Sequence, residues 1–184
     1  MSNIERWTAT IGAAVPVVLA LLLIAPSPGL AQSEQAQAMV VTATVPQSCT
    51  VAPAGALTFS ATTTGQGLPE ADAIATINVS CTTNTSWSIY ADAGVHADAA
   101  SGASQRRVAS SDGATFVAYD LYADAAHANA FPTDAATGQT SATQGTGTGV
   151  DDVQPVSVYG RVPAASSSPN AGLYTDKVAF TVAF

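Results

Sequence analysis

Large apolar side chains alternate with small or polar ones throughout residues 174–184. The even positions are Tyr174, Asp176, Val178, Phe180, Val182 and Phe184, whereas the odd positions hold only Thr, Lys and Ala. A period of two is typical of a β-strand with one buried face and one solvent-facing side. We therefore predict a strand here whose buried face carries the even positions. The question is which strand pairs with it, and whether that partner belongs to the same molecule.

Short alternating stretches of the same kind recur along the chain, separated by Gly, Pro and Ser, and few stretches favour a helix. They predict strands at 39–45, 49–51 continuing toward 57–59, 74–81, 87–91, 106–109, 115–122 and 155–162. This pattern favours an all-β sandwich. From their parity we predict these core residues: Ile77, Val79, Cys81, Trp87, Ile89, Val117, Tyr119, Leu121, Val156 and Val158. The Gly- and Thr-rich end of segment 133–149 is predicted to be a long mobile loop that fills no core.

Residues 1–31 have the features of a secretory signal peptide. Arg6 precedes an apolar run of 15 residues at 11–25, which is shorter than the ~20 residues that span a bilayer. Small residues end this segment, and we predict cleavage after Ala31, with a retained membrane anchor as the alternative. The remaining 153 residues suit one domain that does not span a membrane. The net charge of −8 argues against a nucleic-acid partner.

The chain has two cysteines, Cys49 and Cys81. In an exported protein we expect them to form a disulfide. Two free thiols or half of a metal site are the alternatives. The sequence has no Cys-x-x-Cys spacing and only two histidines, His96 and His127, which disfavours a metal site.

Motifs for catalysis or cofactor binding are absent from the sequence. The GTGTG run at 145–149 lacks the Lys-Ser or Lys-Thr of a phosphate loop, and Gly-x-Ser-x-Gly does not occur. The loop aspartates do not have the spacing of a calcium loop. We therefore predict no catalytic residues, no metal and no cofactor, which disfavours a secreted hydrolase.

Residues 32–48 form a separate segment ahead of Cys49. It begins polar and then alternates, with Met39, Val41, Ala43 and Val45 on one face. Only Pro46, Gln47 and Ser48 link this predicted strand to the domain. So short a tether does not easily reverse the strand across the far side of its own domain, but it allows the strand to reach another molecule.

Several motifs resemble, in order and at similar spacing, the spore coat protein U domain found in pilins of the archaic chaperone-usher pathway. They cover nearly the whole chain after the signal segment. The most specific are the Tyr-x-Leu-Tyr-x-Asp run, the Tyr-Gly followed by Pro163 and the closing Gly-x-Tyr-x-Asp, which comprise Tyr119, Leu121, Tyr122, Asp124, Tyr159, Gly160, Gly172, Tyr174 and Asp176. Two departures are Phe59-Ser60, where the family commonly has Phe-Gly, and a loose match at Arg107-Val108.

The resemblance implies an immunoglobulin-like sandwich over residues 49–184 that lacks its last strand and carries the cysteine pair near its start. The open groove is then filled by the N-terminal extension of a neighbouring subunit, with Met39, Val41, Ala43 and Val45 as the donor face. The implied partners are other pilin subunits, a periplasmic chaperone and an outer-membrane usher. The implied function is a structural pilin that passes through the periplasm and builds a surface fibre (a pilus or fimbrium) for adhesion and biofilm formation. The alternative is a tip or coat binding module, an adhesin or spore coat protein, that recognises a surface or glycan through its loops.

Overall fold

The computed structural model describes residues 34–60, 67–98, 100, 105–165 and 169–184. The predicted signal peptide at 1–31 lies outside these residues. The chain divides into two units at Thr42 and Ala43, and each is described by itself. Residues 34–42 have no regular secondary structure, and their side chains are exposed. The described residues contain no helix of the length and apolarity needed to cross a membrane.

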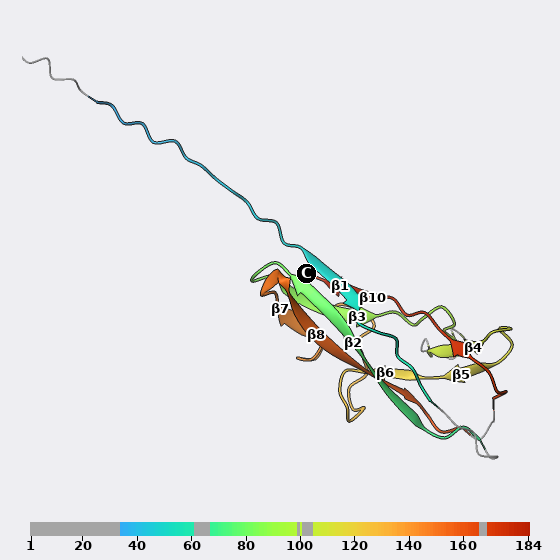
Figure 1. The fold of residues 1–184 in the computed structure, drawn as a ribbon. Helices are drawn as coiled ribbons and strands as arrows, with labels where there is room; N and C mark the ends of the chain where they lie inside the picture. Colours follow the sequence, from blue (N-terminus) through green and yellow to red (C-terminus); the bar gives the residue numbers. More distant parts are fainter. Residues whose placement is uncertain (1–33, 61–66, 99, 101–104, 166–168) are drawn as a thin grey trace, which may run out of the picture. The chain divides into compact units, whose positions relative to one another are not determined.

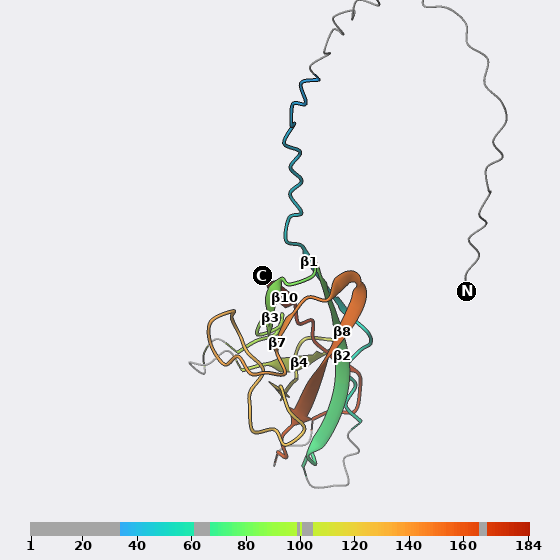
Figure 2. The same ribbon diagram turned by 90° about the vertical axis from the view of Figure 1, so that its left-hand side faces the viewer.

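The unit that begins at Ala43 is built from antiparallel strands (Figures 1 and 2). Their bounds are β1 Cys49–Pro53, β2 Ala71–Cys81, β3 Ser86–Ala91, β4 Arg107–Ser110, β5 Phe116–Ala118, β6 Asp120–Tyr122, β7 Gln144–Thr146, β8 Gly149–Val162, β9 Tyr174–Thr175 and β10 Phe180–Ala183. They form three sheets, with strand orders β1-β2-β8-β6, β10-β3-β7 and β5-β4-β9. The fold is therefore all-β with open sheets, as the sequence predicted.

The core lies between the long β2–β8 pair and β3. Alternation along β2 buries Ile77, Val79 and Cys81, and the same parity on β8 buries Val156 and Val158. Trp87 and Ile89 of β3 close the core from the other sheet. These core predictions are confirmed, as they are for Tyr119 and Leu121, whereas Val117 is only half-buried.

The predicted strand at 115–122 is two strands that belong to different sheets. β5 pairs with β4, and β6 pairs with β8. Between them the backbone N–H of Tyr119 donates to the carbonyl of Arg106 at 3.0 Å. Tyr119 and Leu121 both face the core, so the alternation of core-facing residues is unbroken where the chain changes sheets. The sequence pattern alone therefore does not reveal the change.

The prediction that segment 133–149 fills no core was wrong. Strand β7 lies in this segment, and the side chain of Thr143 is fully buried. A Cβ atom built on Gly145 would lie 2.4 Å from Cζ2 of Trp87, so the glycine lets β7 pack directly against the indole ring. The glycines here serve close packing between strands.

The prediction of a strand at 39–45 also differs from the structure. Residues 34–48 have no strand and are almost all exposed. The physical reason is that a strand needs a ladder of hydrogen bonds to a partner, and residues 39–45 pair with no strand in the described part of the chain. Whether they pair with a strand of another molecule stays a prediction.

Gly147 provides a stability test of the turn between β7 and β8. A Cβ there would lie 2.3 Å from the Thr82 carbonyl oxygen and 2.7 Å from Cβ of Cys81. Because backbone atoms must shift, we expect Gly147→Ala to lower the free energy of unfolding by about 2 to 3 kcal/mol, measured by urea titration. The matched control is Gly55→Ala, where the added Cβ meets no atom within 4 Å. Equal stability of the two variants would contradict the expectation.

Candidate functional site

Two sheet edges that lie side by side form the candidate site. β1 is the edge strand of one sheet and pairs only with β2 among the described residues, whereas β10 is the edge of another sheet and pairs with β3. β1 and β10 contact each other, and Figures 1 and 2 both show them adjacent. Each edge strand presents N–H and C=O groups that a further strand can bind.

Apolar side chains on these edges and elsewhere around the core are incompletely covered. Nine of them pack against the core and yet remain partly exposed: Cys49, Val51, Leu57, Phe59, Val108, Val117, Val178, Phe180 and Val182. Phe184 is 57% exposed. Along residues 174–182 the even positions are half-buried and the odd positions exposed, so the predicted parity is correct. The incomplete burial means that this part of the core lacks a covering layer of side chains.

The segment that precedes β10 is held by the carboxylate of Asp176, whose side chain is only 3% exposed. Its Oδ1 accepts hydrogen bonds from the backbone N–H groups of Val95 at 3.0 Å and His96 at 3.2 Å, and lies 3.1 Å from Nδ1 of His96. Its Oδ2 accepts the hydroxyl of Tyr119 at 2.7 Å. The structure thus brings together Tyr119 and Asp176, which belong to two separate sequence motifs.

A second carboxylate, that of Asp92, holds the next part of the same segment. Its Oδ1 accepts the N–H of Gly94 at 2.9 Å and that of Ala179 at 3.0 Å. The buried guanidinium of Arg106 donates to the carbonyl of Asp92 at 2.9 Å and to that of Ala91 at 3.0 Å. Sequence reasoning missed both residues as contributors to this site, and the arginine pair in the weak strand 106–109 was the available signal. Together, Asp92 and Asp176 fix where β10 starts.

Burial and the nearby Asp176 carboxylate raise the pKa of Tyr119 above its ordinary value. Burial also lowers the pKa of the Arg106 guanidinium. Because the folded state favours the neutral phenol, Tyr119 contributes stability that is fully present below the unfolded pKa of about 10 and is lost as pH rises above it.

This shift gives a pH prediction. Between pH 9 and pH 11.5, roughly, we expect the free energy of unfolding to fall with a slope from Tyr119 of up to about 1.4 kcal/mol per pH unit, and Tyr119→Phe to remove that slope. Urea titrations across this range measure it. Tyr90→Phe, which removes a hydroxyl from a half-buried ring of β3, is the parallel control. Identical slopes for wild type and Tyr119→Phe would show that the assignment is wrong.

Other motif residues lie on β8 and β6, which β2 separates from the β1 edge in the same sheet. A Cβ on Gly160 would lie 2.5 Å from Cδ2 of Leu57 and 2.7 Å from Cζ of Phe59, so only glycine lets these side chains lie flat against β8. Tyr159 pairs with Tyr122 across β8 and β6, and the ring of His127 contacts both tyrosines edge-on.

The remaining motif residues organise loops. Asp124 accepts three backbone N–H groups, those of Ala126, Ala128 and Asn129, and these bonds hold the pKa of its carboxyl below the ordinary value. The Tyr174 hydroxyl donates to the carbonyl of Asn170 at 2.9 Å. Gly172 lies in the same turn, and a Cβ atom built on it would meet no atom within 4 Å.

The predicted disulfide between Cys49 and Cys81 is present and joins β1 to β2 at directly paired positions. This prediction is confirmed. The bond fixes the start of β1, and therefore fixes one of the two edges to the sheet behind it. The predicted donor residues Met39, Val41 and Val45 are each at least 80% exposed and Ala43 is exposed as well, and they pair with no strand among the residues that the structure describes.

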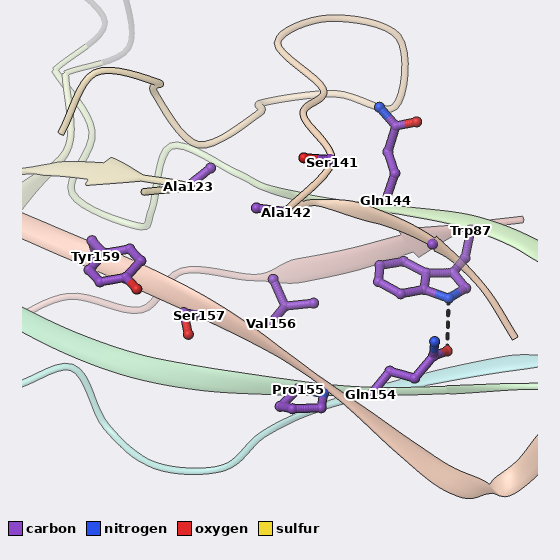
Figure 3. Close-up of a pocket in the computed structure, with 11 residues that line it drawn as sticks. Trp87, Ala123, Ser141, Ala142, Gln144, Gln154, Pro155, Val156, Ser157 and Tyr159 are labelled. Atoms are coloured by element: carbon purple, nitrogen blue, oxygen red, sulfur yellow. Dashed lines mark hydrogen bonds between the residues drawn. The ribbon is translucent and has the colours of Figure 1, made fainter. Parts of the chain in front are cut away.

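The two edges offer backbone groups that can bind a further strand. Within the described residues no group of three or more His, Cys, Asp or Glu is placed to hold a metal ion. His96 contacts Asp176, but no serine hydroxyl is bonded to this histidine in the described part of the chain. A hollow of about 420 Å³ lies beside β8, lined by both polar and apolar side chains, where the indole N–H of Trp87 donates to Gln154 at 3.1 Å (Figure 3).

The fold and the two open edges define a class: an all-β protein whose sheets can accept a further strand. The sequence profile of the Spore Coat Protein U domain family matches residues 35–181. The chain therefore belongs to the spore coat protein U domain family. No curated protein matches it.

Solved structures with a related arrangement include the pre-assembly complex of the chaperone CsuC with the tip adhesion subunit CsuE, from archaic chaperone-usher Csu pili of Acinetobacter baumannii. That match has 21% identity and a TM-score of 0.47, and covers 77% of this chain and 40% of that chain. A chaperone–tip adhesin complex of CFA/I fimbriae matches with 10% identity and a TM-score of 0.39, over 73% of this chain and 40% of the other. The chain thus spans about two fifths of the length of each solved chain.

Proposed function

We propose that this chain is a structural pilin subunit of a chaperone-usher fibre and has no catalytic activity. The observation that carries the proposal is the pair of adjacent sheet edges, β1 and β10, each of which carries half-buried apolar side chains. Membership of the spore coat protein U domain family supports it. So does the similarity to subunits seen in chaperone complexes, from which we take the partners.

In this proposal the extension at 32–48 of one copy supplies the strand that the next copy lacks. Met39, Val41, Ala43 and Val45 face the core of the receiving copy, and their backbone adds to the ladder. Burial of the Met and two Val side chains contributes roughly 5 to 8 kcal/mol before the cost of ordering the segment, at about 1.5 to 3 kcal/mol each. That is sufficient to hold a fibre together.

Before assembly the same edges are an aggregation hazard, because unpaired apolar strand edges pair with each other. A periplasmic chaperone would cover them, and an outer-membrane usher would exchange the chaperone for the next subunit at the cell surface. Residues 1–31 would act as the signal peptide that starts this route.

The experiment that tests the proposal compares the full chain with a chain that lacks Gln32–Val45. We expect the full chain to form fibres visible by electron microscopy and the shortened chain to remain unpolymerised. A shortened chain that still joins into fibres would refute the assignment of the extension as donor.

The second candidate function is a tip or coat binding module. The hollow in Figure 3 offers Gln144, Gln154 and Ser157 as hydrogen-bonding groups for a sugar. However, its Trp87 ring is only 6% exposed, which leaves little aromatic surface for a sugar to stack on. Binding of the purified chain to glycans without self-assembly would favour this candidate over the pilin.

A further inference from the structure

The base of the extension lies beside a hollow of about 850 Å³. Val45, Pro46 and Gln47 line one side of it, and the turn at 82–85 and residues 148–152 line the rest. The carbonyl of Ser48 accepts the N–H of Thr82 at 2.9 Å, which fixes the base of the extension against this turn. If the extension is inserted in a second copy, this hollow must face that copy. The reason is that only Pro46–Ser48, about 10 Å of extended chain, link the inserted strand to the domain that carries the hollow.

An acidic bulge forms the far side of the hollow. Residues 150–153 leave the β2–β8 ladder between the pairs Val79↔Gln154 and Cys81↔Gly149. All four are exposed, and within the described residues neither Asp151 nor Asp152 makes an ion pair or side-chain hydrogen bond. These two carboxylates are therefore available to a cation on another molecule.

Most of the Arg and Lys side chains that the structure describes already make ion pairs or hydrogen bonds within the chain. Arg106 is buried on backbone carbonyls, Arg107 pairs with Asp98, and Arg161 pairs with Asp72. Lys177 is exposed and makes no ion pair within the residues that the structure describes. It precedes β10, and its carbonyl accepts the N–H of Val95 at 3.1 Å.

The domain has two ends, called poles here, and the direction of the inserted strand decides which pole of one copy meets which pole of the next. Only one direction brings Asp151 and Asp152 of one copy close to Lys177 of the other. The base of β1 and the end of β10 lie at the same pole, where the chain end is marked beside β1 in both views (Figures 1 and 2). If the inserted strand ran parallel to β10, this pole of the donor copy would meet the same pole of the receiving copy. The receiving copy's own extension begins at that pole, and its own Asp151 and Asp152 lie there. An antiparallel strand avoids this collision and joins unlike poles, which generates an open filament.

The antiparallel arrangement also matches the lengths of the two segments and the faces on which their large side chains lie. Met39–Val45 and Val178–Phe184 are seven residues each. Pairing Val45 with Val178 places Ala43 opposite Phe180, Val41 opposite Val182 and Met39 opposite Phe184, with all these side chains on the core face. Pro46 then lies directly opposite Lys177, next to the acidic bulge.

We propose that Asp151 and Asp152, beside the base of one copy's extension, contact Lys177 of the copy that receives this extension. The partner is thus a second copy of this chain, and the contact sets the direction of the fibre and speeds its assembly. This inference rests on the proposed function. Its charges are exposed, so its main effect is on the rate of association and on the dependence of that rate on salt.

The test follows assembly of the full chain by light scattering, with electron microscopy of the product. At about 20 mM NaCl we expect Lys177→Glu to slow assembly roughly three- to tenfold, and the Asp151→Lys, Asp152→Lys double variant to slow it similarly. Combining all three substitutions should restore a rate within about twofold of wild type. The differences should vanish at about 500 mM NaCl, where exposed charges are screened.

The matched control is Lys177→Arg, which keeps the charge and should assemble like wild type. Thermal unfolding of each variant checks that the fold is intact. A Lys177→Glu chain as fast as wild type at low salt, or a triple variant no faster than its parents, would overturn the contact. Fibres that form normally in every variant would refute this inference alone, whereas a wild-type chain that forms no fibre would refute the proposed function as well.

Discussion

Val41→Asp is expected to abolish fibre formation, whereas Val40→Asp is expected to leave it nearly intact. The two valines are neighbours and are about equally exposed in the single chain, at 80% and 86%. Only Val41 lies on the proposed donor face. An aspartate there must be buried without a partner in the receiving subunit, which costs several kcal/mol and lowers the affinity by at least about 100-fold.

The measurement is polymer yield by size-exclusion chromatography and electron microscopy, on the two variants at equal concentration. Both substitutions add the same charge to the same exposed segment, so general effects of charge and solubility cancel. Thermal unfolding should be unchanged in both, since neither side chain is buried in the single chain. If the two variants lose fibres to the same extent, the facing of the donor segment is wrong. If neither loses fibres, the segment is not the donor.

The positions of most strands could be predicted because alternation is a local property of the sequence. β2, β3 and β8 each bury a row of apolar side chains with a period of two, and those rows are visible without a structure. The ends were less predictable. β8 begins at Gly149 within a glycine-rich run that reads as a loop, because what makes it a strand is its pairing with Cys81 of β2, which is distant in sequence.

The change of sheet at Tyr119 is a clearer example of a feature that local alternation does not predict. Val117, Tyr119 and Leu121 share one parity, so the pattern predicts one continuous strand. Up to the Tyr119 N–H, which binds the Arg106 carbonyl, the chain continues its pairing with β4, and from Asp120 onward it pairs with β8 instead. Both partners are set by the tertiary fold, and no local pattern encodes them.

The candidate site could be predicted in outline. The half-buried even positions of 174–182 follow from parity, and the family resemblance identifies Tyr119 and Asp176 as motif residues. Their contact, and the contribution of Asp92 and Arg106, required the structure, because buried polar groups pair through geometry that a single sequence does not display.

Asp176→Ala is expected to lower the free energy of unfolding by about 3 to 5 kcal/mol and to abolish fibres. The substitution removes a buried acceptor. It leaves the N–H group of His96 and the hydroxyl of Tyr119 without their partner, and leaves the N–H of Val95 with only the Lys177 carbonyl. Because these bonds also place the segment that leads into β10, the edge that would receive the donor strand loses its fixed position. Urea titration measures the stability, and electron microscopy measures the fibres.

Asp124→Ala is the matched control for this last substitution. Asp124 accepts three backbone N–H groups, where Asp176 accepts two and a hydroxyl, but it lies in an open loop where water can replace it. We expect a much smaller loss of stability there and normal fibres. Tyr119→Phe, which removes one of the bonds to Asp176, should fall between the two, with a loss of about 1 to 2 kcal/mol. An Asp176→Ala chain as stable as Asp124→Ala would mean that the carboxylate is not what fixes this edge. An unstable Asp176→Ala chain that still polymerises normally would mean that the β10 edge need not be preformed, and that the incoming donor strand orders it on binding.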